Sequence, residues 1–136
     1  MKFHHVGYLV KNMDDSIAAF RVMGFTVTKE PMHDAIRRSL IAFMNHENNG
    51  VCVELIQPEN ENSPVFGLLK KYKNAPYHLC FQTDDMNEDI KKLEQNGYML
   101  FKECEFAPCI DDGTGEVVFM MNPYIGMIEL YKSGNA

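Results

Sequence analysis

Two histidines and two glutamates stand at matching points of a repeated pattern, and they are the residues of this chain best placed to do chemistry. His5 and His78 lie 73 residues apart, and Glu54 and Glu129 lie 75 apart. Imidazole nitrogens and carboxylate oxygens without thiolate form a mixed ligand set for a divalent cation, and they can leave positions open for water or substrate. The sequence therefore predicts His5, Glu54, His78 and Glu129 as ligands of one metal ion, without distinguishing Ni, Co, Mn, Fe(II) or Zn.

The repeat extends beyond these four residues. The segment His5-Val-Gly-Tyr-Leu-Val10 aligns with His78-Leu-Cys-Phe-Gln-Thr83, and Val53-Glu-Leu55 aligns with Ile128-Glu-Leu130. Two copies of this length indicate a duplicated module rather than a solenoid. Taken alone, a strand histidine is usually a core or surface residue, and a lone glutamate is equally often an edge charge. Their joint placement favours the metal interpretation.

Each copy is predicted to fold as a βαβββ module. The first module opens with a strand over Phe3–Val10, followed by a helix that is capped by Asn12 and ends at Gly24. In the second module the helix is capped by Asp85 and ends at Gly97, and Glu88 completes a capping box. Hydrophobic alternation and turn residues predict the other strands. These are Phe25–Glu30, Arg38–Met44, Val51–Gln57, Tyr98–Lys102, Glu116–Met121 and Met127–Tyr131.

The expected organisation is one domain over residues 1–136, with a first module 1–57, a linker 58–76 and a second module 77–136. In the linker, Ser63 is expected to cap a short helix with Pro64 at its first position. The predicted fold class is α+β, with paired βαβββ modules forming a curved mixed sheet around a metal cleft.

Period-two alternation places the glutamates on one sheet face and aliphatic residues on the other. Glu54 shares a face with Cys52 and Ile56, while Val53 and Leu55 point the opposite way. A carboxylate within an apolar strand is costly to bury unless it is paired or metal-bound. A cation with open positions could chelate substrate oxygens and stabilise an enolate. Glu129 or Glu54 is then the candidate base that takes the proton.

Composition and charge limit the other partners. The chain is 46% hydrophobic with a net charge of -6, which argues against binding to nucleic acid or to an anionic membrane. No apolar run is long enough for a membrane span, and we expect a cytoplasmic protein with reduced cysteines. The basic pairs Arg37-Arg38 and Lys70-Lys71 are expected to be solvated, with binding of a small-ligand phosphate as the alternative.

The residues resemble the vicinal-oxygen-chelate superfamily, which includes glyoxalase I, methylmalonyl-CoA epimerase, bleomycin-resistance proteins and extradiol dioxygenases. The segments that carry the resemblance are His5-Val-Gly-Tyr-Leu-Val10, Val53-Glu-Leu-Ile-Gln-Pro58, Tyr77-His-Leu-Cys-Phe81 and Gly126-Met-Ile-Glu-Leu130. The resemblance implies a glyoxalase-like fold, a metalloenzyme, and metal ligands at His5, Glu54, His78 and Glu129. It also implies a homodimer, by analogy with other members.

Within that superfamily the chain is most similar to methylmalonyl-CoA epimerases, because Asn62-Ser-Pro-Val-Phe66 follows the second expected ligand. The implied substrate is an acyl-CoA thioester. The strand Arg38–Met44 contains no acidic residue, so one-base and two-base mechanisms both stay open. The alternatives are a glyoxalase I-type lactoylglutathione lyase acting on a 2-oxoaldehyde hemithioacetal and a metal-free binding protein of the bleomycin-resistance type. The sequence does not identify substrate-binding residues.

Overall fold

The structure is a computed structural model that describes residues 1–135. The chain divides into two compact units, described separately below. The N-terminal unit comprises His5–Tyr77, and the C-terminal unit comprises Met1–His4 together with residues 78–135. The predicted single domain is not tested by this division and stays a prediction.

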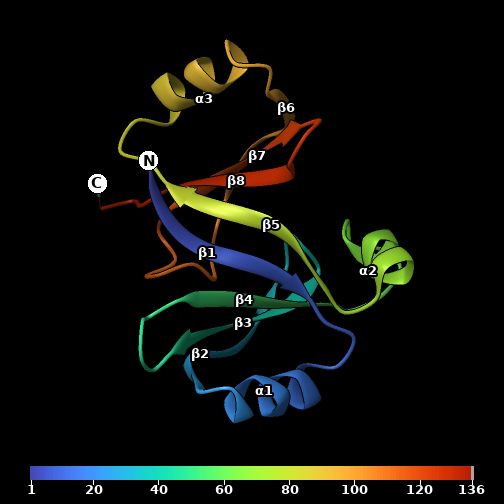
Figure 1. Cartoon of the computed structure of the whole chain (residues 1–136). Helices are drawn as coiled ribbons and strands as arrows, with labels where there is room; N and C mark the ends of the chain where they lie inside the picture. The colour runs from blue at the N-terminus through green and yellow to red at the C-terminus, as the bar shows by residue number, and fades with distance from the viewer. Residues whose placement is uncertain (136) are drawn as a thin grey trace. The chain divides into compact units, whose positions relative to one another are not determined.

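The N-terminal unit is a mixed sheet with a helix against one face (Figure 1). Its strands lie in the order β2-β3-β4-β1, and only the contact between β1 and β4 is parallel. The elements are β1 (Lys2–Leu9, shared with the other unit), α1 (Met13–Val22), β2 (Phe25–Asp34), β3 (Ser39–His46), β4 (Cys52–Pro58) and α2 (Phe66–Tyr72).

The C-terminal unit repeats this arrangement with the strand order β5-β8-β7-β6 and a parallel contact between β5 and β8. Its elements are β5 (Ala75–Gln82), α3 (Met86–Glu94), β6 (Met99–Phe106), β7 (Glu116–Asn122) and β8 (Gly126–Lys132). The predicted α+β class and the duplicated βαβββ module are therefore confirmed.

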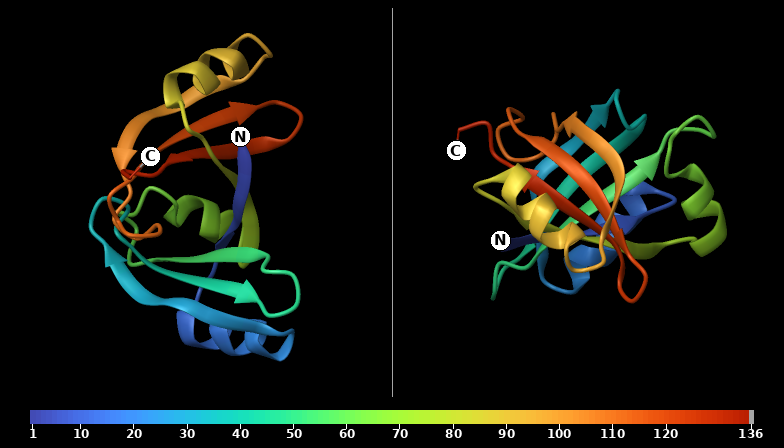
Figure 2. Two further views of the ribbon diagram at one scale, coloured as in Figure 1. Left: turned by 90° about the vertical axis from the view of Figure 1, so that its left-hand side faces the viewer. Right: turned by 90° about the horizontal axis from the view of Figure 1, so that it is seen from above.

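In Figure 2, α1 and α3 each lie against one face of the sheet of their own unit, and their buried residues pack on the aliphatic side chains of that face. In the N-terminal unit, Met13 and Ile17 of α1 pack in one core with Val53 and Leu55 of β4. In the C-terminal unit, residues of α3, β7 and β8 form the equivalent core. Its buried members are Met86, Leu93, Val118, Met120, Ile128 and Leu130. The predicted alternation on β4 and β8 is correct, so the opposite face of each sheet carries the glutamate.

The second strand of each module is longer than predicted. β2 continues to Asp34 and β6 to Phe106, and each is interrupted by two register shifts against its neighbour. A β-bulge breaks the two-residue periodicity on which the prediction relied, and this explains why the pattern ended early. The strand β5 starts at Ala75, inside the predicted linker 58–76.

The predicted start of the linker helix is wrong. The helix α2 begins at Phe66, and its N-cap residue Val65 makes no side-chain capping bond. The Ser63 hydroxyl donates instead to the backbone carbonyl of Arg37 at 3.0 Å and lies 3.1 Å from the Ser39 hydroxyl. Ser63 therefore anchors the β2–β3 turn, and although its hydroxyl also accepts a long bond of 3.4 Å from the Val65 amide, it is not the N-cap of α2.

The predicted N-caps are correct in both modules. Asn12 Oδ1 accepts a bond from the Asp15 amide at 3.0 Å, and Asp85 Oδ1 accepts one from the Glu88 amide at 3.0 Å. The Asp85 amide donates to Thr83 Oγ1 and not to Glu88, so the predicted capping box forms only in part. None of the helices in the described part of the chain has the length and apolar character of a membrane span.

The cap of α1 gives a stability prediction. Asn12→Ala should lower the free energy of unfolding by about 1 kcal/mol, because the Asp15 amide loses its acceptor at the helix start. Urea denaturation followed by circular dichroism measures this, with the exposed Asn48→Ala as control. Equal midpoints for the two variants would contradict the assigned cap.

Candidate metal centre

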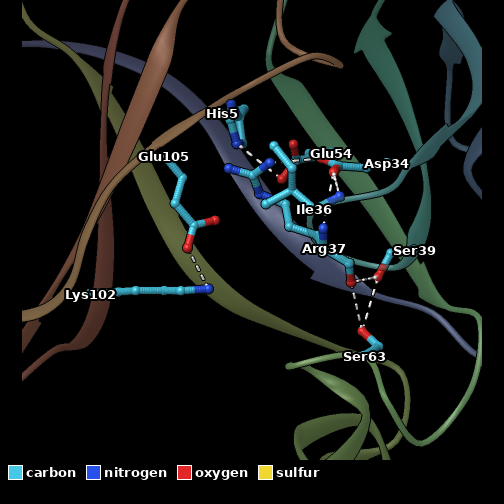
Figure 3. Close-up of polar contacts among 9 residues, drawn as sticks. All are labelled: His5, Asp34, Ile36, Arg37, Ser39, Glu54, Ser63, Lys102 and Glu105. Carbon is cyan, nitrogen blue, oxygen red and sulfur yellow. Dashed lines mark hydrogen bonds and ion pairs between the residues drawn. The ribbon is translucent and has the colours of Figure 1, made fainter.

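The N-terminal unit places His5 and Glu54 on neighbouring parallel strands, facing each other. Glu54 lies beside Gly7 in the register of β1 and β4, two residues beyond His5. The His5 Nε2 atom is 3.4 Å from Glu54 Oε1, as Figure 3 shows. The two side chains are 0% and 5% exposed, so this polar pair is withdrawn from bulk water.

The C-terminal unit builds the same pair from β5 and β8. Glu129 lies beside Cys80, again two residues beyond the histidine, here His78. His78 Nε2 is 3.6 Å from Glu129 Oε1, and the side chains are 0% and 3% exposed. The four predicted residues therefore form two matching histidine–glutamate pairs, one in each unit.

The separations within these pairs suit ligands of a common ion. A hydrogen bond between a ring nitrogen and a carboxylate oxygen normally spans about 2.7–3.2 Å, shorter than the 3.4 Å and 3.6 Å found here. Two ligand atoms each about 2.1 Å from one cation lie roughly 3.0–3.4 Å apart for octahedral to tetrahedral angles. The 3.4 Å separation lies at the upper end of this range and the 3.6 Å separation lies just beyond it. The donor types and the burial fit a divalent metal, while the ligand assignment itself stays a prediction.

A phenylalanine supports each histidine, and the sequence analysis missed both. The rings of His5 and Phe43 meet edge to face with centroids 5.4 Å apart, and those of His78 and Phe119 do so at 5.5 Å. Phe43 and Phe119 each stand directly opposite the unit's glutamate on the neighbouring strand. Because Phe43 and Phe119 occupy equivalent positions in the β3–β4 and β7–β8 hairpins, the sequence repeat could have pointed to both residues. An aromatic wall at this position orients the imidazole and excludes water from it.

The N-terminal unit adds a charged residue that the sequence analysis expected to be solvated. The Arg37 side chain is only 15% exposed and donates from Nη1 to Asp34 Oδ2 at 2.9 Å. The solvated interpretation is therefore wrong for Arg37, although Arg38 is exposed as expected. Sequence alternation could not show this, because both residues lie in the turn between β2 and β3.

Comparison with known proteins identifies the family. The pattern of the Glyoxalase/Bleomycin resistance protein/Dioxygenase superfamily matches residues 4–114. The chain belongs to this superfamily. Similar sequences include two proteins named mitochondrial methylmalonyl-CoA epimerase. The one from Dictyostelium discoideum is 26% identical over 68% of this chain, and the one from Bos taurus is 27% identical over 75%. The matches span 55% and 58% of those relatives' own lengths.

Solved structures with other sequences share the fold. Methylmalonyl-CoA epimerase from Mycobacterium tuberculosis has a TM-score of 0.80 at 18% identity, covering 96% of this chain and 87% of that one. A methylmalonyl-CoA epimerase in complex with methylmalonyl-CoA and NH4+ has a TM-score of 0.79 at 20% identity, covering 97% and 94%. The predicted glyoxalase-like fold is therefore confirmed.

Away from the two pairs, this superfamily member has a cysteine with an unusual pKa. Cys104 on β6 lines a hollow of about 370 Å³ together with Glu105, Glu116 and Lys132. Partial burial, then the hydrogen bond and negative charge of Glu116, raise the pKa of the Cys104 thiol from 9.0 to about 11. The thiol stays protonated in neutral solution, and any stability it contributes is present below pH 9 and lost as pH rises towards 11.

The raised pKa predicts that the Cys104 thiol reacts slowly with alkylating reagents. At pH 8 the thiolate fraction of Cys104 should be about 100-fold below that of a cysteine with a pKa of 9.0. Iodoacetamide labelling followed by peptide mass spectrometry measures the rate between pH 7 and 11. Glu116→Gln should recover part of the reactivity because it removes the negative neighbour. A labelling rate at pH 8 equal to that of a model peptide would contradict the assignment.

Proposed function

We propose that this protein is a metal-dependent enzyme that removes the proton next to the carbonyl of an acyl-CoA thioester, in the manner of a methylmalonyl-CoA epimerase. The observation that supports the proposal most directly is the buried histidine–glutamate pair repeated in each unit. Superfamily membership and the names of the similar sequences point to the same chemistry.

In this proposal His5, Glu54, His78 and Glu129 together hold one divalent cation. Each pair offers one imidazole nitrogen and one carboxylate oxygen, and each carboxylate is buried, where an uncompensated charge is costly. Two such half-sites would supply four ligands with a net charge of about -2, which a divalent ion balances. Bound there, the ion supplies Lewis-acid stabilisation of negative charge developing on a carbonyl oxygen.

The residues of the chain would divide the remaining work. Glu129 or Glu54 is the base that takes the α-proton, since each carboxylate is fixed on a rigid strand. Phe43 and Phe119 exclude water from the histidines, which strengthens electrostatic interactions in the site. Epimerisation also requires that a proton return to the opposite side of the carbon, and both a one-base and a two-base route are consistent with the proposal.

The proposed partner is a small acyl-CoA thioester, and a homodimer and a cytoplasmic location stay predictions. The relatives named as epimerases are described as mitochondrial. A glyoxalase I-type lyase acting on a hemithioacetal would use the same ligands and the same proton transfer. The two activities differ in substrate, so one protein preparation can be assayed for both.

The shared metal site predicts one ion per chain. Titration of metal-free protein with Co²⁺, followed by visible absorbance and calorimetry, should give a single binding event. His5→Gln and His78→Gln should each weaken it at least about 100-fold, since loss of even an outer-shell partner typically costs 10–100-fold.

A matched control for the metal titration is His33→Gln. His33 also pairs with a glutamate, Glu59, but its side chain is 54% exposed, so Co²⁺ affinity should be unchanged in this variant. Two independent binding events per chain, each weakened by only one of the two histidine substitutions, would contradict a shared site.

The proposed reaction predicts proton exchange at the α-carbon. Metal-loaded protein incubated with methylmalonyl-CoA in deuterated water should replace the α-proton by deuterium, observed by proton NMR. Glu129→Gln or Glu54→Gln should reduce exchange by at least about 100-fold, because a positioned base contributes 10²–10⁴-fold.

A parallel reaction with methylglyoxal and glutathione distinguishes the alternative. Formation of a lactoyl thioester without methylmalonyl-CoA exchange would overturn the epimerase proposal in favour of a glyoxalase-type lyase. No reaction with either substrate would contradict both. Glu59→Gln is the control for exchange, since Glu59 pairs with His33 away from the buried pairs.

A further inference from the structure

Arg37 is held in place from both sides of its backbone. Its amide donates to Asp34 Oδ1 at 3.0 Å, as does the Ile36 amide. Its carbonyl accepts bonds from the hydroxyls of Ser39 and Ser63, each at 3.0 Å. An arginine fixed in this way loses little further freedom when it binds a ligand, so its charge is preorganised.

The anchors of Arg37 lie on the same sheet face as Glu54. Ser39 stands directly opposite Asp34 on β2 and is four residues before Phe43, which stands opposite Glu54. Residues separated by an even number along a strand share a face, and so do directly opposed pairs. Figure 3 shows the Arg37 side chain extending from the turn towards His5 and Glu54. The guanidinium therefore belongs to the face that carries the proposed metal ligands.

The ion pair with the buried Asp34 explains the direction of the Arg37 side chain, and its guanidinium can also bind a ligand. Asp34 is 1% exposed, and its carboxylate receives two backbone amides and one guanidinium bond. A guanidinium is planar and always charged, and its fork matches a carboxylate with two parallel bonds. The Arg37 side chain keeps 15% exposure, although Nη2 itself is buried, so a ligand on this face would approach the guanidinium from its exposed part.

We propose that Arg37 is a specificity-determining residue that binds the free carboxylate of the substrate beside the His5–Glu54 pair. This inference rests on the proposed acyl-CoA chemistry and specifies its substrate class as thioesters with a carboxylate on the carbon that loses its proton. A thioester without that carboxylate would lack the charge-assisted contact, which typically contributes enough for a 10- to 100-fold difference in affinity. Asp34 acts through Arg37 as a positioning residue.

The test compares two ligands that differ only in that carboxylate. Calorimetry on the metal-loaded protein gives dissociation constants for methylmalonyl-CoA and propionyl-CoA. Wild-type protein should prefer methylmalonyl-CoA by at least about 10-fold, and Arg37→Met should lose at least about 10-fold of this preference. Arg37→Lys keeps the charge without the fork, so it should show an intermediate preference.

Arg38→Met is the matched control, because it removes the same charge from the neighbouring, exposed position. It should leave the preference for methylmalonyl-CoA unchanged. The melting temperatures of the Arg37→Met and Arg38→Met variants are also compared. A purely structural role for Arg37 predicts a lower melting temperature with the preference retained. That result overturns the proposal, as does wild-type protein without any preference. If Arg37→Met fails to fold, the decision rests on Arg37→Lys.

The proposed function is judged separately, by proton exchange in wild-type protein. Exchange together with a preference unchanged in the Arg37 variants would overturn only the role of Arg37. Preference that depends on Arg37 without any exchange would overturn the epimerase reaction and keep Arg37 as a carboxylate-binding residue.

Discussion

The constraint on which the rest of this structure depends is the burial of a carboxylate on an apolar strand in each unit. Glu54 and Glu129 are 3% and 2% exposed, and the effective cost of removing such a group from water is several kcal/mol. An adjacent histidine on a parallel strand shares that burial in both units. A fold under no functional demand would place aliphatic residues here, as it does on the opposite face of the same strands.

The duplicated module places a histidine beside the buried glutamate with the same geometry in both units. In each unit the histidine strand runs parallel to the glutamate strand with a two-residue offset, and a phenylalanine on the next strand contacts the ring. Because alternate residues point to opposite faces, the helix can take the aliphatic side without disturbing the polar side. Stability and chemistry are thereby separated onto two faces of one sheet.

Local patterns were sufficient to predict the modules, their faces and the two histidine–glutamate pairs, because these depend on periodicity and repetition. They were insufficient where tertiary contacts decide. Ser63 was expected at a helix cap, yet its hydroxyl bonds to the carbonyl of Arg37, a residue 26 positions earlier. Arg37 was expected in water because small basic groups usually lie on solvated faces, whereas the structure pairs it with the buried Asp34. β-Bulges likewise hid the full length of β2 and β6.

The turns between the second and third strands differ in chemistry between the two modules. In the N-terminal unit this turn is polar and contains Asp34 and Arg37. The corresponding turn of the C-terminal unit buries Ala107, Cys109 and Ile110. A metal site made of two equivalent half-sites would by itself accept a substrate in either of two related orientations. The N-terminal turn contributes an arginine paired with a buried carboxylate, whereas the C-terminal turn carries Asp111 and Asp112 beside its buried apolar residues. The two copies are therefore not chemically equivalent, and in the proposed site this divergence would give a symmetric ligand set a directional substrate site.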